Sequence, residues 1–304
     1  MSRTYRLGGL KIASDLELPE LMSWDGPSGA PADAVFCLDH VPPQLEAPDH
    51  VAPMFQTKGR NEYLLAVPGT GRFLVREGCE VTIEAEPGAD PIAVRTFVTG
   101  PVQAVLWHQR GLLPLRASVV VVDGRAVALA GPSGMGKSTL AAVLAAMGHN
   151  VIADDICVIG AGKIAEASVQ PGLPRLLLWR DALDRLGIPP EGLRRALSSR
   201  EKYFVDSGQG SVCELHKLAA LVVLVRQVSC ALTIERLRGH YALCKLHSIV
   251  HVRRAARALG RDPDIFTALT SLAPMGVTVW QLAVPDNPAC LDEAAAKVVA
   301  ALQS

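Results

Sequence analysis

A glycine-rich octapeptide is the stretch of this chain whose residue types and spacing most directly suggest chemistry. It reads Gly131, Pro132, Ser133, Gly134, Met135, Gly136, Lys137 and Ser138, and it fits the pattern G-x-x-x-x-G-K-[ST]. The backbone N–H groups of such a loop point inward and form a concave anion site at the start of a helix. In this pattern Lys137 is expected to reach the outer phosphates of a nucleotide, and the Ser138 hydroxyl to bind Mg²⁺. The octapeptide therefore predicts a nucleoside triphosphate site.

The residues on either side of the octapeptide favour the same interpretation. The segment RAVALA (125–130) before it has the apolar character of a buried strand. The segment KSTLAAVLAAM (137–147) has the composition of a helix, and Gly148 suits the position just after a helix C-terminus. A strand, a glycine-rich loop and a helix in this order form the context in which the pattern binds phosphate.

Two adjacent aspartates, Asp154 and Asp155, end the next apolar run, NVIADD. If this strand is parallel to the one before the loop, the two C-terminal ends share one edge of the sheet. Neighbouring carboxylates repel each other unless a cation or a proton separates them. We therefore expect Mg²⁺ to be held by Ser138 and one carboxylate, while the other carboxylate accepts a hydroxyl proton or orients the attacking group.

The whole chain reads as a β-rich segment followed by an α/β segment. Residues 1–90 contain three strand-like runs, EYLLAV, RFLVRE and EVTIEAE, which predict an antiparallel meander. The turn-rich PGADP (87–91) separates them from a region in which strands and helices alternate. We therefore expect a β-rich N-terminal domain over 1–90 and an α/β phosphate-loop domain over 91–304.

The strand that leads into the octapeptide is predicted to pair with its predecessor. Asp123-Gly124 joins SVVVV (118–122) to RAVALA (125–130), and Asp-Gly between two such runs is a strong signal for a two-residue antiparallel hairpin. This arrangement is unusual for a phosphate-binding loop.

Helical spacing predicts further elements in the second domain. Apolar residues recur at helical spacing over 92–110, interrupted by Gly-Pro, and again over 244–260. The aromatic side chain of Trp179 is expected to pack in the core.

Composition and charge exclude several classes of protein. Lys plus Arg and Asp plus Glu both number 30, so no basic excess favours nucleic acid or an anionic membrane surface. The longest apolar run, 218–225, is too short to span a membrane, and the N-terminus lacks the pattern of a secretory signal. Seven scattered cysteines without a C-x-x-C pair suit a reducing compartment. A cytoplasmic protein is expected, without nucleic-acid or membrane partners.

The combination of hairpin, glycine-rich loop, short helix and an Asp-Asp pair seventeen residues after the lysine resembles the HPr kinase/phosphorylase family. The resemblance is closest over Leu115–Ile159. It implies an α/β fold with an HPr-kinase/phosphoenolpyruvate-carboxykinase-like P-loop core and an N-terminal β-rich domain. The segments LPL-x-AS before the loop and PRLLLW-x-DAL-x-x-LGI after the aspartates look like a bacterial subset of this family. Some members of that subset phosphorylate the C-terminal serine of lasso-peptide precursors.

The resemblance also implies roles for individual residues. ATP would be held by Gly131 to Thr139, Mg²⁺ by Ser138 and Asp155, and the serine proton would pass to Asp154. Lys137 and Mg²⁺ would neutralise the charge of the transferred group.

Arg116 departs from the family pattern, since relatives carry histidine at this position in L-H-A-S. Its permanent positive charge is expected to lower the pKa of Asp154 and to offer donors to phosphate, so Arg116 is included among the catalytic candidates. Side chains that could hold the acceptor or its phosphate are Arg175, Arg180, Arg200 and Lys202.

The function expected from these residues is that of an ATP-dependent and magnesium-dependent serine kinase. Its acceptor would be a small protein or peptide, and a lasso-peptide precursor is the acceptor that the resemblance suggests; HPr itself is not expected. Two alternatives stay open: a nucleotide hydrolase or switch, and an inactive nucleotide-binding module. A homo-oligomer also stays open.

Overall fold

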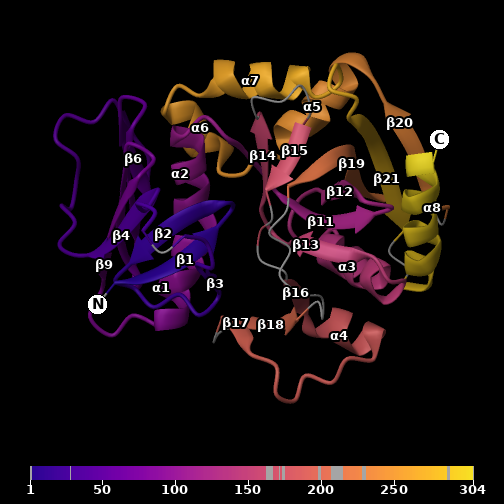
Figure 1. Ribbon diagram of the computed structural model, residues 1–304, viewed down its shortest axis with the longest axis horizontal. Helices are drawn as coiled ribbons and strands as arrows, with labels where there is room; N and C mark the ends of the chain where they lie inside the picture. The colour runs from indigo at the N-terminus through magenta and orange to yellow at the C-terminus, as the bar shows by residue number, and fades with distance from the viewer. Residues whose placement is uncertain are drawn as a thin grey trace. The chain divides into compact units, whose positions relative to one another are not determined.

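The structure is a computed structural model that describes residues 2–27, 29–161, 167–170, 172, 175–197, 200–206, 215–227, 231–285 and 288–303 (Figure 1). The fold is mixed α/β. Contacts divide the chain into two compact units, the first comprising Met1–Pro114 and His251–Ile265, the second Leu115–Val250 and Phe266–Ser304. The boundary expected at residue 91 therefore falls inside the first unit. Within the described residues, no helix is both long enough and apolar enough to cross a membrane.

The first unit is built on one sheet with the strand order β3-β1-β2-β4-β9-β8-β7-β6-β5. The strands are β1 (Arg3–Leu7), β2 (Leu10–Ser14), β3 (Met22–Ser23), β4 (Ala34–Leu38), β5 (His50–Val51), β6 (Phe55–Lys58), β7 (Glu62–Val67), β8 (Gly71–Arg76) and β9 (Glu80–Ala85). Strands β7, β8 and β9 pair antiparallel in succession, so the meander predicted from sequence is confirmed.

Helices of residues 91–109 belong to the first unit because they pack on this sheet. They are α1 (Pro91–Phe97), the π-helical turn η1 (Val98–Val102) and α2 (Gln103–Gln109). The interruption expected at Gly100-Pro101 is the π turn, since Pro101 has no N–H for the helical ladder. The side chain of Gln109 accepts from Gly78 N at 2.8 Å and donates to the carbonyl of Val75 at 3.2 Å, which fastens α2 to strand β8 and the turn after it.

A buried histidine lies in the same layer of the first unit. His108 on α2 is only 2% exposed, and its Nε2 lies 2.9 Å from the carbonyl oxygen of His251, just before α6 (Arg253–Ala258). Burial is the main cause that lowers the pKa of His108 to about 4; the hydrogen bond with His251 opposes this effect, and the charge of Arg261 adds to it. His108 is therefore neutral at physiological pH and donates to a carbonyl.

The first unit should lose stability as the pH falls from 6.5 to 4. In this window the unfolded chain binds a proton at His108 and the native chain does not, so stability decreases on acidification by about 3 kcal/mol in total. His108→Gln keeps an N–H donor but takes up no proton, so its urea-unfolding free energy should fall less between pH 7 and pH 4.5 than that of the wild type. Equal losses in the two proteins would contradict this assignment.

The second unit is built on a sheet in which β14, β15, β19, β12, β11 and β13 follow one another, with β20 and β21 continuing beside β19. Its strands are β11 (Ala117–Val122), β12 (Arg125–Ala130), β13 (Asn150–Ala153), β14 (Cys157–Ala161), β15 (Ala167–Gln170), β19 (His216–Gln227), β20 (Thr233–Leu237) and β21 (Thr278–Pro285). Strand β10 (Leu113–Leu115) lies where the first unit gives way to the second.

The hairpin predicted at Asp123-Gly124 is confirmed. Strands β11 and β12 pair antiparallel in continuous register, and both turn residues have positive φ, 48° and 74°. Strand β13 pairs antiparallel with the other edge of β11. Strands β12 and β13 are therefore parallel, with β11 between them, and their C-terminal ends lie at the same edge of the sheet.

Helices and one small sheet complete the second unit. The small sheet has the order β16-β18-β17. The elements are α3 (Lys137–Ala146), β16 (Arg175–Trp179), α4 (Arg180–Leu186), β17 (Arg195–Leu197), β18 (Arg200–Asp206), α5 (Gly239–Ser248), η2 (Pro288–Cys290) and α8 (Leu291–Gln303), with α7 (Asp262–Ser271) crossing from the first unit.

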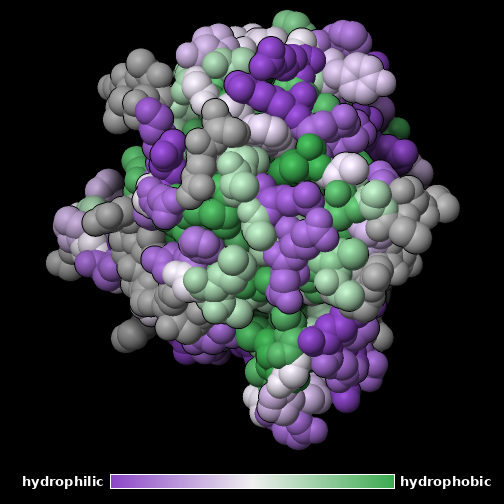
Figure 2. Space-filling view, turned by 90° about the vertical axis from the view of Figure 1, so that its right-hand side faces the viewer, coloured by the Kyte–Doolittle hydropathy of each residue, from purple (hydrophilic) through white to green (hydrophobic). Residues whose placement is uncertain are grey.

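The core of the second unit lies between its main sheet, α3 and α8. Buried side chains of the strands, such as Val127 and Val222, join Leu140 and Leu144 of α3 and Val298 of α8 in one apolar cluster. Figure 2 faces the side that carries α8 and β20 in Figure 1, where hydrophobic patches alternate with hydrophilic ones. The buried cluster fixes α3, and thus the loop before it, on the sheet.

The single helix predicted over 244–260 is wrong. Helix α5 ends at Ser248, and Val252 has a left-handed φ of 45° before α6 begins. The reason is a pairing that sequence periodicity does not encode: Arg116 N donates to the carbonyl of Ile249 at 2.8 Å, and Leu115 forms an isolated bridge with Val250. Backbone pairing with this segment replaces the helical hydrogen bonds.

Candidate functional site

The glycine-rich loop connects the end of β12 to the start of α3. Gly131, Gly134 and Gly136 have φ values of 147°, 84° and 86°, which a residue with a Cβ rarely adopts. Gly136 is the N-cap of α3, and Leu140 N donates to its carbonyl at 2.8 Å. The Nζ of Lys137 donates to the carbonyl of Pro132 at 2.9 Å, so the lysine folds back across the loop.

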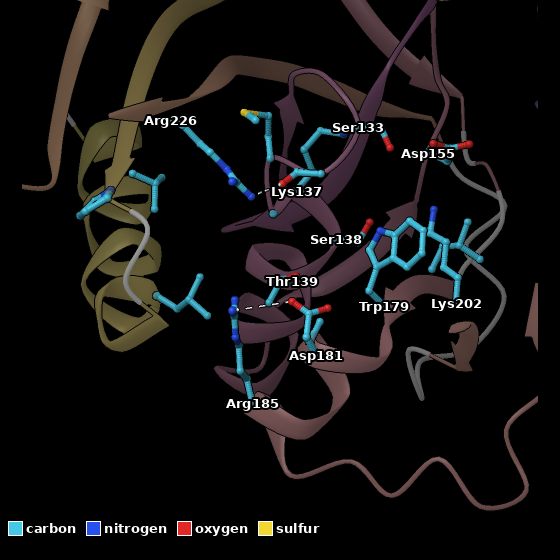
Figure 3. A pocket seen from close by; sticks show the side chains of 18 residues that line it. Ser133, Lys137, Ser138, Thr139, Asp155, Trp179, Asp181, Arg185, Lys202 and Arg226 are labelled. Carbon is cyan, nitrogen blue, oxygen red and sulfur yellow. Dashed lines mark hydrogen bonds and ion pairs between the residues drawn. The ribbon is translucent and has the colours of Figure 1, made fainter. Parts of the chain in front are cut away.

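Strand β19 supports the loop from the side. A Cβ on Gly131 would lie 3.0 Å from the backbone oxygen of Leu224, so a side chain at this position would force the backbone of β19 to shift. Two residues further along β19, the guanidinium of Arg226 donates to the carbonyl of Gly134 at 3.2 Å. Figure 3 shows Arg226 reaching toward the loop beside Lys137.

Replacing Gly131 by alanine should destabilise the protein more than replacing Gly134. Both variants store backbone strain, which costs about 1–3 kcal/mol at each position. Only Gly131→Ala adds a clash with a backbone atom, because a Cβ at Gly134 meets nothing within 4 Å. The urea-unfolding free energy of Gly131→Ala should therefore be lower than that of Gly134→Ala by about 1–3 kcal/mol. Equal losses would contradict the close approach to β19.

The carboxylate of Asp154 accepts hydrogen bonds from three different elements. Ser118 of β11 donates to Oδ1 through its hydroxyl, and Ser138 of α3 donates to the same oxygen at 2.9 Å. The backbone N–H of Leu177 on β16 donates to Oδ2 at 2.7 Å. Asp154 therefore joins the main sheet, the helix after the loop and the small sheet.

Burial raises the pKa of Asp154, and the neighbouring charge of Asp155 adds to the effect. The hydrogen bonds from Ser118, Leu177 and Ser138 oppose it without cancelling it. The pKa of Asp154 is therefore raised and not lowered as expected beside Arg116, because loss of solvation outweighs the effects that lower it.

Arg116 is nevertheless tied to the loop. Its carbonyl accepts from Gly131 N at 3.3 Å, and its positive charge lowers the pKa of Lys137. Burial is the main cause that lowers the lysine pKa, and the carboxylates of Asp155 and Asp154 oppose it, in that order. The positive charge of Arg116 therefore disfavours the charged form of Lys137.

A pocket opens in front of the loop, within the second unit (Figure 3). Residues Ser133 to Thr139 line it, whereas Gly131, Pro132, Arg116 and Asp154 are not among its lining residues. The lining side chains from outside the loop include Asp155, Trp179, Arg185, Lys202 and Arg226.

Asp155 and Trp179 add a carboxylate and an aromatic ring to the lining of this pocket. Asp155 has a left-handed φ of 69° and lines the pocket, whereas the carboxylate of its neighbour Asp154 is held by the three donors described above. Trp179 was expected in the core, and this is wrong: the residue is 36% exposed and lines the pocket, because it ends β16 at the edge of the small sheet.

The other basic candidates do not all line the pocket. Lys202 lines the pocket, but Arg180 pairs with Asp184 on α4 at 2.9 Å, and the guanidinium of Arg175 lies 4.0 Å from the ring centroid of Phe204. The side chain of Arg200 lies outside the described residues.

Sequence reasoning missed Ser118, Arg226 and the N–H of Leu177. Ser118 could have been found, because a hydroxyl directly before four valines in a buried strand needs a hydrogen-bond partner. The contributions of Leu177 and Arg226 come from pairings distant in sequence and leave no local signal.

A scan of protein-family models and a search of curated proteins gave no match to this chain. Among solved structures, it is similar to the HPr(Ser) kinase/phosphatase from Coxiella burnetii, with 13% sequence identity and a TM-score of 0.34. The match covers 63% of this chain and 99% of that chain. A likeness of this degree assigns neither residues nor activity, which are argued below from the geometry of the site.

Proposed function

We propose that this protein is an ATP-dependent kinase that phosphorylates a serine hydroxyl of a small protein or peptide. The observation that carries the proposal is the 2.9 Å hydrogen bond between Ser138, at the start of α3, and the carboxylate of Asp154, at the end of β13. It joins a glycine-rich loop with a buried lysine to an acidic strand end, which is the combination that phosphoryl transfer requires. The corresponding fold is an HPr-kinase-like P-loop core with an N-terminal β-rich domain.

The triphosphate of ATP would lie along Gly131 to Thr139. Positive φ at three glycines supports this, because it lets successive N–H groups turn toward an anion. The Lys137 ammonium, now bonded to Pro132, would exchange that carbonyl for the outer phosphates.

The donor set fits a magnesium ion. The Ser138 hydroxyl and the Asp154 carboxylate offer adjacent oxygen ligands, and Mg²⁺ is usually bound by one or two carboxylates together with nucleotide phosphates. When bound, Mg²⁺ would neutralise charge on the phosphate oxygens.

For the two aspartates we propose the reverse of the roles that the sequence resemblance implies. Both carboxylate oxygens of Asp154 accept hydrogen bonds, and one of these comes from Ser138, the other proposed magnesium ligand. We therefore assign Asp154 to binding the magnesium ion. Asp155 lines the pocket, where an acceptor hydroxyl could reach it. The position of the carboxylate relative to the acceptor hydroxyl matters more than its basicity, because a loose transition state needs only weak general-base assistance.

The proposed reaction balances without a further reactant. The serine oxygen forms a bond to the γ-phosphorus as the bond from that phosphorus to the bridging β–γ oxygen breaks. ADP leaves with the bond's electron pair, and the hydroxyl proton passes to the Asp155 carboxylate. Lys137 stabilises the charge on the transferred group.

The acceptor is tested with the short peptide encoded nearest the gene, since a lasso-peptide precursor is what the resemblance suggests. After incubation with protein and Mg-ATP, intact-mass spectrometry should find at least one added phosphate. Asp155→Asn should slow this gain about 100-fold, the size of a typical general-base effect, while retaining ATP binding. Asp123→Asn, in the hairpin turn, is the matched control and should be as active as the wild type.

Two results would contradict the kinase proposal. ATP consumption that depends on Asp155 without any mass gain would favour a hydrolase or switch. ATP binding with neither consumption nor mass gain would favour an inactive nucleotide-binding module.

A further inference from the structure

The pocket has two arms on either side of the glycine-rich loop. Figure 3 shows Arg226 on one side of Lys137 and Ser138, and Asp155, Trp179 and Lys202 on the other. Arg226 lies opposite Val284 in the pairing of β19 with β21, so the pocket-lining Val284, Pro285 and Leu291 belong to the Arg226 side. We call this side the nucleoside arm, and the side with Asp155, Trp179 and Lys202 the acceptor arm.

The positions of Asp155 and Lys137 indicate which arm receives the nucleoside and which receives the acceptor. Asp155 and Lys137 both line the pocket, and Asp155, to which the acceptor proton is proposed to pass, lies in the acceptor arm (Figure 3). A lysine in this loop pattern contacts the outer phosphates, so the γ-phosphate end faces the acceptor arm. The nucleoside then lies toward the apolar Val284, Pro285 and Leu291.

The acceptor arm continues along one face of the small sheet. Trp179 lies opposite Lys202, Leu177 opposite Phe204, and Arg175 opposite Asp206. Alternate residues of a strand share a face, so these six side chains form one strip that begins at the pocket. The intervening residues Leu176, Leu178 and Tyr203 are buried on the other face.

Aromatic rings and cations alternate along this strip. The Lys202 Nζ lies 5.6 Å from the ring centroid of Trp179, and the guanidinium carbons of Arg175 and Arg194 lie 4.0 Å and 5.1 Å from that of Phe204. Trp179 and Arg194 are exposed, and Lys202 and Phe204 are half-buried. Such a surface attracts carboxylates through its cations and packs apolar groups against its rings.

We propose that the strip formed by Arg175, Leu177, Trp179, Lys202, Phe204 and Asp206 binds the acceptor as an extended polypeptide segment with acidic side chains next to its serine. This rests on the proposed function and names the substrate class of the same site. Charge complementarity argues for an acidic segment, since Lys202 and Arg194 lie over the rings that an extended chain would cross. Continuity with Asp155 argues for the acceptor rather than an unrelated partner.

The test uses two fluorescein-labelled decapeptides, one alternating Glu and Leu around a central Ser, the other with Lys in place of Glu. Fluorescence anisotropy with the full chain should detect binding of the acidic peptide only. Lys202→Glu and Trp179→Ala should each weaken it at least about tenfold. Trp179→Ala should keep the affinity for N-methylanthraniloyl-ATP within about twofold, because the nucleoside lies in the other arm. Lys245→Glu on α5, which does not line the pocket, is the matched charge control and should change neither affinity.

Three outcomes would overturn the inference. If the acidic and basic peptides bound equally well, or if neither bound, the proposal that the acceptor segment is acidic would be contradicted. Loss of nucleotide affinity in Trp179→Ala with peptide affinity intact would make Trp179 a nucleobase platform. In these cases retained binding of the ATP analogue by the wild type leaves the proposed nucleotide site standing, whereas absence of that binding would overturn the proposed function as well.

Discussion

The carboxylate of Asp154 is the constraint on which the candidate site depends. It is buried, so each oxygen needs hydrogen-bond donors, and these come from β11, α3 and β16 through Ser118, Ser138 and Leu177 N. Losing one donor would leave a buried acceptor unsatisfied, at a cost of about 1–3 kcal/mol. One charged group thereby fixes the start of the helix after the loop, the exit of the acidic strand and the edge of the small sheet that forms the acceptor arm.

The unusual hairpin before the loop follows from the same requirement. Because β11 lies between β12 and β13, the loop and the acidic pair leave the sheet at the same edge although one strand separates them. That intervening strand supplies Ser118, which a direct pairing of β12 with β13 would exclude. On the other side β19 approaches Gly131 through Leu224 and contacts the loop through Arg226. The loop is thus supported by both neighbours of the strand that precedes it.

Local patterns predicted much of the framework, and long-range contacts decided the rest. Asp123-Gly124 and the octapeptide specify their own backbone conformations, so the hairpin and the strand–loop–helix order could be read directly. The break between α5 and α6 could not, because Arg116 pairs with Ile249, which is far away in sequence. Trp179 looked like a core residue for the same reason: its position at the edge of β16 depends on a register with β18 that no short window contains. The raised pKa of Asp154 likewise reflects burial by elements distant in sequence.

The most direct measurement of the central claim is a calorimetric titration of ATP into the wild type and into Asp154→Asn, each with magnesium and with EDTA. The proposed site predicts that the wild type binds ATP and that removing magnesium weakens this binding at least about tenfold, since Asp154 and Ser138 would hold the ion and the ion would neutralise charge on the phosphates. Asp154→Asn should bind with nearly the same affinity in both conditions. No binding by the wild type, or an undiminished magnesium effect in the variant, would contradict the proposed role of Asp154.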